Sequence, residues 1–194
     1  MADTRIPSLE EIAREQKRLN TRQRFRRILR STVGVLIVAA AAAAILATLF
    51  MPVLRVSGDS MSPALSDGDI LLLWKTDRLK TGDLIGFSWQ NKLLLKRVIG
   101  FPGDVISIDE QGTVTVNGEV LVEPYVDEKA LGECSIEFPY QVPESRYFVL
   151  GDHRATSIDS RSTVIGCVDR EQVVGKVLCR IWPLPKEWTD IFHR

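Results

Sequence analysis

Ser31 to Leu54, a stretch of 24 residues, contains no charged side chain. Within it, residues 33–51 (VGVLIVAAAAAAILATLFM) are almost entirely apolar. A helix of 19 residues is roughly 28 Å long, close to the hydrocarbon thickness of a bilayer, about 30 Å. Pro52 should end this helix because proline lacks the N–H that the helical hydrogen bonds need. The sequence therefore predicts a transmembrane helix over residues 32–51 rather than a buried core helix.

The charges before and after this stretch differ in sign. Residues 1–30 carry nine basic and four acidic side chains, whereas the remainder carries 16 basic and 21 acidic ones. The basic residues cluster at residues 22–30 (RQRFRRILR), and only Arg55 lies just beyond the apolar run. The positive-inside rule then places residues 1–31 in the cytoplasm and residues 52–194 outside the cell membrane. A cleaved signal peptide is the alternative, but the long basic region and long apolar run favour an uncleaved anchor.

Residues 52–194 contain short β-rich segments separated by Gly, Pro, Asn and Asp. They predict a mainly β, antiparallel domain without helices of useful length, in which residues 121–145 form an irregular excursion. Asn117-Gly118, between two alternating segments, predicts a tight hairpin turn. The expected strands cover residues 69–75, 83–89, 92–101, 104–109, 113–121, 146–152 and 173–182.

Three cysteines, Cys134, Cys167 and Cys179, fall in this exported part. Their odd number excludes complete pairing. A Cys134–Cys167 disulfide and buried free thiols are both compatible with the sequence. Because there is no CxxC motif and no histidine cluster, we expect no metal and no other cofactor.

Ser60 lies in the turn-forming segment SGDSMSPALSDGD, residues 57–69. Gly58 and Pro63 favour a tight turn that presents a hydroxyl and aims backbone N–H groups at a neighbouring carbonyl oxygen. A serine nucleophile needs a base, yet the chain has only two histidines, His153 and His193, and both are distant in sequence. If Ser60 is a nucleophile, its base is expected to be another type of residue.

The segment LLLKRVIGFPGD, residues 93–104, offers such a base. Because side chains alternate along a strand, Lys96 and Arg97 point to opposite faces, each among apolar neighbours. The two cations could reach solvent at an edge strand, or Lys96 could be buried. Burial lowers the pKa of a lysine from about 10.4 and yields a neutral amine, whereas arginine stays protonated. Lys96 is therefore the candidate base and Arg97 is not.

Four segments follow the anchor in order: SGDSMSPAL, GDILLL, LKRVIGFPGD and GDHRATSIDSR. They resemble the motif boxes of bacterial type I signal peptidases (leader peptidases), and the resemblance spans Val56 to Trp182. It implies an antiparallel β-sheet, signal-peptidase-like catalytic domain and a membrane-anchored serine endopeptidase. Such an enzyme removes signal peptides from exported preproteins after small residues (Ala-X-Ala sites) and needs no cofactor.

The resemblance also implies residue roles, with Ser60 as nucleophile and Lys96 as general base. Ser157 would donate to or accept from the Lys96 amine and orient it, and the Ser60 backbone N–H would form the oxyanion hole. Some members place a helping serine hydroxyl where this chain has Gly58, so only backbone help is expected there. The supporting network would consist of Asp159, Arg161 and Arg97.

His153 occupies a position where the bacterial family usually has asparagine. Related eukaryotic and sporulation-type enzymes use histidine as the base, but in the position of the lysine box, which here keeps Lys96. We therefore expect His153 to form hydrogen bonds within its loop. A shallow apolar cleft for small side chains is expected to be lined by Val56, Met61, Leu65, Leu94 and Leu95.

Two other functions fit parts of this pattern. Self-cleaving repressors of the SOS type also combine GDSM with a later lysine, but they act in the cytoplasm behind a DNA-binding helix-turn-helix. A membrane-tethered β scaffold would bind exported chains without cutting them, and would not need Ser60 and Lys96. Turnover of a preprotein by the wild type but not by Ser60→Ala separates these alternatives. We expect preproteins and the lipid bilayer as partners, and no nucleic acid.

Overall fold

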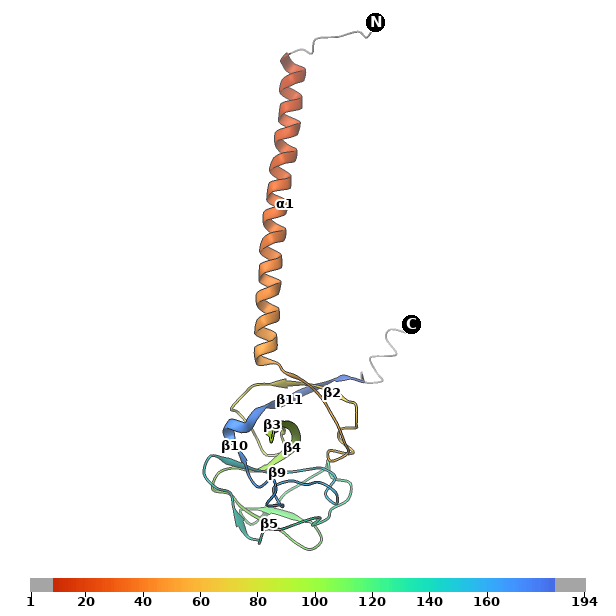
Figure 1. Cartoon of the computed structure of the whole chain (residues 1–194), viewed down its shortest axis with the longest axis vertical. Helices are drawn as coiled ribbons and strands as arrows, with labels where there is room; N and C mark the ends of the chain where they lie inside the picture. Colours follow the sequence, from red (N-terminus) through yellow and green to blue (C-terminus); the bar gives the residue numbers. More distant parts are fainter. Residues whose placement is uncertain (1–8, 184–194) are drawn as a thin grey trace. The chain divides into compact units, whose positions relative to one another are not determined.

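The computed structural model describes residues 9–183, as a long helix and a β-rich unit (Figure 1). The chain divides into two units, Met1–Leu49 and Phe50–Arg194.

Helix α1 runs without a break over Leu9–Phe50, 42 residues. Residues 9–33 contain neither glycine nor proline, so nothing separates the basic segment from the apolar run. The helix ends two residues before Pro52, as the sequence predicts. Its Gln16–Phe50 portion is long and apolar enough to cross a membrane, and its most apolar window is not buried by any other part of the described chain.

The second unit consists of two antiparallel sheets, which confirms the mainly β fold class. The larger has seven strands in the order β1-β2-β11-β3-β4-β9-β10. The smaller has four in the order β7-β6-β5-β8. The bounds of the larger sheet are β1 Val53–Arg55, β2 Ile70–Trp74, β3 Leu84–Trp89, β4 Lys92–Gly100, β9 Arg146–Leu150, β10 Val168–Asp169 and β11 Val173–Trp182. Those of the smaller sheet are β5 Val105–Ile108, β6 Val114–Val116, β7 Glu119–Val120 and β8 Tyr140–Gln141.

The seven expected strand segments all contain strands, and the one over residues 113–121 is the β6–β7 hairpin. Its turn residues Asn117 and Gly118 have φ angles of 53° and 84°, as a tight hairpin turn requires. Three short strands, β1, β8 and β10, were not expected, because two or three residues are too few to show an alternating pattern. A single 3₁₀ turn, Arg170–Gln172, is the only helical element described after α1.

The core of this unit consists of three apolar clusters, and strand β4 takes part in all of them. One lies between the two sheets and joins Ile99 and Phe148 to Ile106 and Val114. A second joins Leu95 to the loop after β1, and a third packs Val98 against β3 and β9. Strand β4 is therefore covered on both faces, which is why both Lys96 and Arg97 can be buried. The three cysteines are free thiols.

Candidate active site

Ser60 lies in the loop that connects β1 to β2. Backbone hydrogen bonds close the base of this loop, from Val56 N to Asp69 O (2.7 Å) and from Gly68 N to Val56 O (3.0 Å). Gly58 has a φ of 89°, and its N–H donates to Asp67 Oδ1 at 2.9 Å. The neighbouring Met61 is fully buried in the second apolar cluster, whereas Ser60 is half-buried. The turn is thus fixed on its inner side and leaves Ser60 near the surface.

Lys96 lies on β4, between the neighbouring strands β3 and β9, and is only 4% exposed. Burial is the main cause that lowers the pKa of its amine below the ordinary value of 10.5. The carboxylates of Asp159, Asp152 and Asp59 partly oppose this, while the positive charge of Arg161 lowers the pKa further. A buried amine with a depressed pKa is the kind of group that can act as a base near neutral pH.

Arg97 contributes differently from the sequence expectation. Its guanidinium donates to both carboxylate oxygens of Asp152, at 2.8 and 2.5 Å, and to Gly82 O at 2.6 Å. It therefore pairs with Asp152 and not with the Asp159–Arg161 pair that the sequence analysis assigned to it. The reason is strand alternation, which places it on the face opposite Lys96.

Asp159 and Arg161 form a second, fully buried pair in the 151–161 loop. Arg161 Nη2 lies 2.8 Å from Asp159 Oδ2, and Arg161 Nε donates to Asp159 Oδ1 at 2.9 Å. Asp159 Oδ2 also accepts from the Gly151 N–H at 2.9 Å. These bonds fix both ends of the loop, with the Lys96 amine within electrostatic reach of both side chains.

Ser157 lies inside this loop, next to Gly151. A Cβ added to Gly151 would meet Ser157 Oγ at 2.1 Å and Ser60 O at 2.7 Å. The loop and the Ser60 turn are also joined by a hydrogen bond from His153 N to Ser60 O, 3.1 Å. Ser157 Oγ is buried and has no hydrogen-bond partner within the described residues, so the expected bond to Lys96 is not formed in this structure. An unpaired buried hydroxyl is costly and calls for an explanation.

His153 forms contacts within its loop. Its Nδ1 lies 2.5 Å from Thr156 Oγ1, and the side chain is half-buried. It also borders a hollow of about 250 Å³ beside the Ser60 turn. The residues that line this hollow are Ser62, Pro63, Asp127, Glu128, Asp152 and His153.

The five apolar residues expected to line the substrate cleft are not all neighbours. Val56, Met61, Leu65 and Leu95 belong to the second apolar cluster, whereas Leu94 packs against the third. Alternation along β4 separates Leu94 from Leu95. Three of the five positions therefore lie on the loop that carries Ser60, Leu95 packs against them from β4, and Leu94 lies on the other face of β4.

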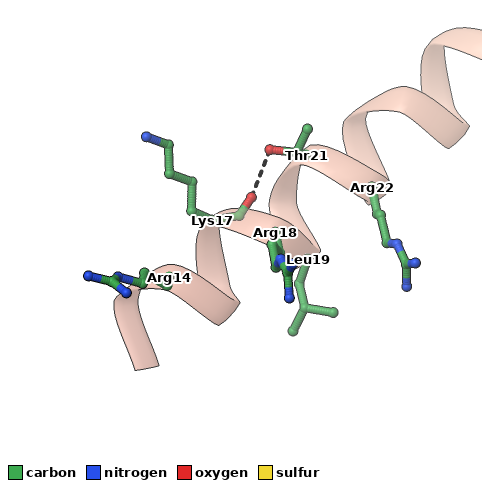
Figure 2. A pocket seen from close by; sticks show the side chains of 6 residues that line it. All are labelled: Arg14, Lys17, Arg18, Leu19, Thr21 and Arg22. Carbon is green, nitrogen blue, oxygen red and sulfur yellow. Dashed lines mark hydrogen bonds between the residues drawn. The ribbon is translucent and has the colours of Figure 1, made fainter. Parts of the chain in front are cut away.

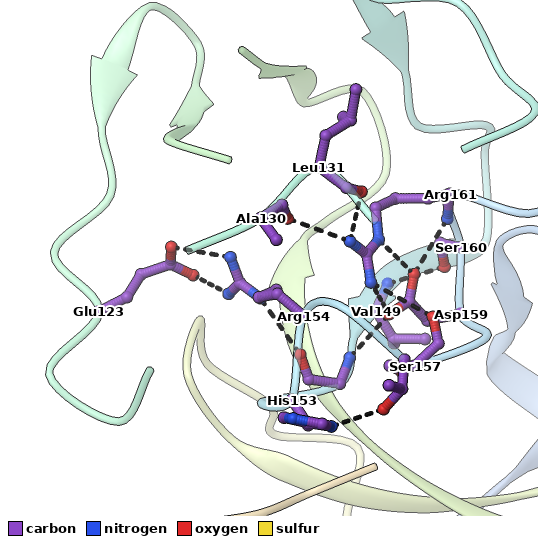
Figure 3. Close-up of polar contacts among 12 residues, drawn as sticks. Glu123, Ala130, Leu131, Val149, His153, Arg154, Ser157, Asp159, Ser160 and Arg161 are labelled. Carbon is purple, nitrogen blue, oxygen red and sulfur yellow. Dashed lines mark hydrogen bonds and ion pairs between the residues drawn. The ribbon is translucent and has the colours of Figure 1, made fainter. Parts of the chain in front are cut away.

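A third buried ion pair was not anticipated from the sequence. Arg154 Nη2 and Glu123 Oε1 form it, and their side chains are only 1% and 0% exposed. Figure 3 shows Arg154 between Glu123 and the loop that carries Ser157. GDHR offers an arginine, but its acidic partner lies 31 residues away in the irregular excursion, so no local pattern could have identified the pair. In the described part of the chain, no group of three or more His, Cys, Asp or Glu side chains could hold a metal ion.

The candidate site thus contains a buried lysine on a central strand and a half-buried serine in a turn, and comparison with known proteins identifies the family of the chain. The family description "Signal peptidase, peptidase S26" matches residues 29–182. The chain therefore belongs to the signal peptidase family S26, and it is a hydrolase of peptide bonds.

Individual relatives carry related names. Signal peptidase I of Bacillus licheniformis is 38% identical over 155 residues, 73% of this chain and 82% of that protein. Signal peptidase IB of Staphylococcus aureus is 35% identical over 148 residues, 66% of this chain and 76% of that protein. A crystal structure of a signal peptidase I from Enterococcus faecalis is 30% identical and covers 54% of this chain and 100% of that one, with a TM-score of 0.43.

Proposed function

We propose that this protein is a membrane-anchored serine endopeptidase that cleaves signal peptides from exported preproteins, with Ser60 as nucleophile and Lys96 as general base. The observation that carries the proposal is the burial of Lys96 on a central strand, where desolvation lowers its pKa. Membership of the signal peptidase family supplies the substrate class.

The chemistry would proceed in two halves. The neutral Lys96 amine accepts the proton of Ser60 as Oγ attacks the scissile carbonyl carbon, and the resulting ammonium donates that proton to the leaving amine. Water then attacks the acyl-enzyme, again with Lys96 as base, and releases the signal peptide with a free carboxylate. The Ser60 backbone N–H would stabilise the negative charge that develops on the carbonyl oxygen.

Among the described residues, Ser60 Oγ and the Lys96 amine form no hydrogen bond with each other. Catalytic hydrogen bonds are often long in the free enzyme and tighten when substrate binds. The unpaired Ser157 Oγ also supports a site that completes its hydrogen bonds when substrate binds. This hydroxyl is buried beside the Ser60 turn and is available to orient the Lys96 amine. The free energy that it costs to bury this hydroxyl without a partner would then serve to pre-organise the active site.

Helix α1 would anchor the enzyme in the cell membrane, with the basic segment in the cytoplasm. Figure 2 shows basic side chains, among them Arg14, Lys17 and Arg22, projecting from α1 before its apolar part. Such clusters are retained on the cytoplasmic side, where anionic lipids attract them. The β unit would then face the side on which exported preproteins emerge.

Cleavage after Ala-X-Ala sites is the specificity that we propose. Val56, Met61, Leu65 and Leu95 are tightly buried around the Ser60 turn, so this region has little space to expand for large side chains. Small residues at the positions one and three before the cut would therefore be preferred.

The test is cleavage of a preprotein by the detergent-solubilised protein, with the cut site mapped by mass spectrometry. Ser60→Ala and Lys96→Ala should each lose a factor of about 10⁴–10⁶ in kcat, because the two groups act as a unit. Ser57→Ala, an exposed serine of the same turn, and Lys92→Ala, an exposed lysine of the same strand, are matched controls that should stay active. Substantial activity in Lys96→Ala combined with its loss in His153→Ala would show that the base is His153.

A further inference from the structure

Residues 121–136, which we call the strap, cross the 151–161 loop without regular secondary structure. We propose that the strap positions this loop, and that Glu123 is the positioning residue through which it does so. The proposal deepens the proposed function, since the loop carries Ser157 and lies against Ser60. Three buried arginines, Arg97, Arg154 and Arg161, each contact the strap on one side and the loop on the other.

Glu123 reaches the site through two successive contacts. Its carboxylate accepts hydrogen bonds from both terminal nitrogens of Arg154, one of them at 3.1 Å. Both side chains are fully buried. Arg154 Nε in turn donates to Gly151 O at 3.1 Å. Gly151 is the residue that fits tightly between Ser60 O and Ser157 Oγ. A shift of the Glu123 carboxylate would therefore change the separation of the two candidate active-site serines.

Tyr125 makes the second connection. Its ring lies over the Arg97 guanidinium, 3.7 Å from the ring centroid, and its hydroxyl donates to Glu123 Oε1 at 3.3 Å. Arg97 holds Asp152, the residue directly after Gly151. The Arg97–Asp152 pair thus joins strand β4 to the loop, and the Tyr125 ring of the strap covers Arg97. Tyr125 is in turn hydrogen-bonded to Glu123.

Arg161 makes the third connection, shown in Figure 3. It donates to Leu131 O at 2.5 Å and to Ala130 O at 3.3 Å while pairing with Asp159. The strap also comes very close to the loop here, since a Cβ on Gly132 would meet Arg154 O at 2.4 Å. The strap is therefore held against the loop near its start, at Glu123, and again at residues 130–132.

The buried ion pairs of the three arginines are better explained by positioning of the 151–161 loop than by stabilisation of the fold. A buried pair is often no more stabilising than apolar residues of similar volume, but its directional hydrogen bonds specify one geometry. Here Arg154 and Arg161 belong to the loop that bears the unpaired Ser157 hydroxyl, and Arg97 pairs with Asp152 of the same loop. The charged groups that act on the Lys96 amine are Asp159, Arg161, Asp152 and Asp59, and the strap holds Arg161 directly and Asp152 through Arg97.

The experiment compares Glu123→Gln with Glu133→Gln, an exposed glutamate of the same strap, in the full-length protein in detergent. Glu123→Gln should lower kcat by about 100-fold, the loss typical of a 1 Å misplacement, with little change in KM. It should also move the ionisation in the pH profile of kcat/KM to higher pH, because a looser loop admits water to Lys96. Hydrogen exchange of the amides of residues 151–161 should become faster. Glu133→Gln should resemble the wild type in all three measurements.

A double variant, Glu123→Met with Arg154→Met, separates positioning from stability. It replaces the buried pair by apolar side chains and should recover the thermal stability of the wild type. Because this variant lacks Arg154, the donor to Gly151 O, its kcat and its loop exchange should stay altered. Wild-type kcat and exchange in this folded variant, or in Glu123→Gln, would overturn the proposal.

Different results would contradict the proposed function and the proposed role of the strap. If the wild type cleaves no preprotein, or Ser60→Ala cleaves as well as the wild type, the endopeptidase assignment is wrong. The exchange comparison between Glu123→Gln and Glu133→Gln still decides whether the strap positions the loop.

Discussion

Gly151→Ala tests whether the separation of Ser60 and Ser157 matters for cleavage. The added methyl carbon would lie 2.1 Å from Ser157 Oγ, 2.5 Å from Ser157 Cβ and 2.7 Å from Ser60 O. Ordinary contact begins at 3.4 Å, so the Ser157 hydroxyl falls short by about 1.3 Å and the Ser60 carbonyl oxygen by about 0.7 Å. Because one of these atoms is backbone, rotation of a side chain cannot relieve both contacts.

A misplacement of about 1 Å costs roughly 100-fold in rate, or about 2.7 kcal/mol of transition-state stabilisation. We therefore expect kcat/KM for a good preprotein to fall by about two orders of magnitude. Overpacking should also lower the free energy of unfolding by about 1–3 kcal/mol, measured by urea titration.

Gly100→Ala is the matched control, since its added carbon would meet Ile106 Cδ1 at 2.6 Å in the core between the sheets. It should lose a similar amount of stability but keep its activity. Near-normal cleavage by Gly151→Ala would refute the reasoning, because it would show that catalysis tolerates a displaced Ser157.

Four further predictions concern the pH dependence of cleavage and of stability, the orientation in the membrane, and the substrate. Cleavage should accelerate as the pH rises through an ionisation below 10.5, because burial lowers the Lys96 pKa and only the neutral amine accepts a proton; the absence of such a rise would contradict Lys96 as the base. With its lowered pKa, Lys96 binds fewer protons in the folded state than in the unfolded chain. The free energy of unfolding should therefore increase with pH between the lowered pKa and 10.5. Urea titrations of Lys96→Met should show a smaller increase over the same pH range. Protease added to spheroplasts should degrade the chain after Pro52 and leave residues 22–30 intact, and the reverse pattern would contradict the proposed orientation. Peptides with bulky residues one and three positions before the cut should be poor substrates, and proline directly after the cut should block turnover; equal turnover of the bulky peptide would argue against a small-residue site.

Local patterns were enough to predict the helix and most strands of this protein. The apolar run before Pro52 forms a continuous helix, as its composition predicts, and Asn117-Gly118 adopts the positive φ angles that a tight hairpin needs. The choice of Lys96 over Arg97 as candidate base also needed no structure, because arginine does not lose its proton at ordinary pH. These conclusions depend on side-chain chemistry and on residues that are close in sequence.

Tertiary structure decided which charges surround the site. Strand β4 is buried on both faces because separate apolar clusters pack against Leu95 and Val98, and strand alternation alone left edge exposure equally possible. The cation that lowers the Lys96 pKa is Arg161, whereas Arg97 pairs with Asp152.

The Glu123–Arg154 pair could not be found from sequence at all. Its two residues lie 31 positions apart, and one belongs to a segment without regular structure. The partner of a buried charge is set by long-range packing, because only the folded chain removes both groups from water and makes their pairing necessary.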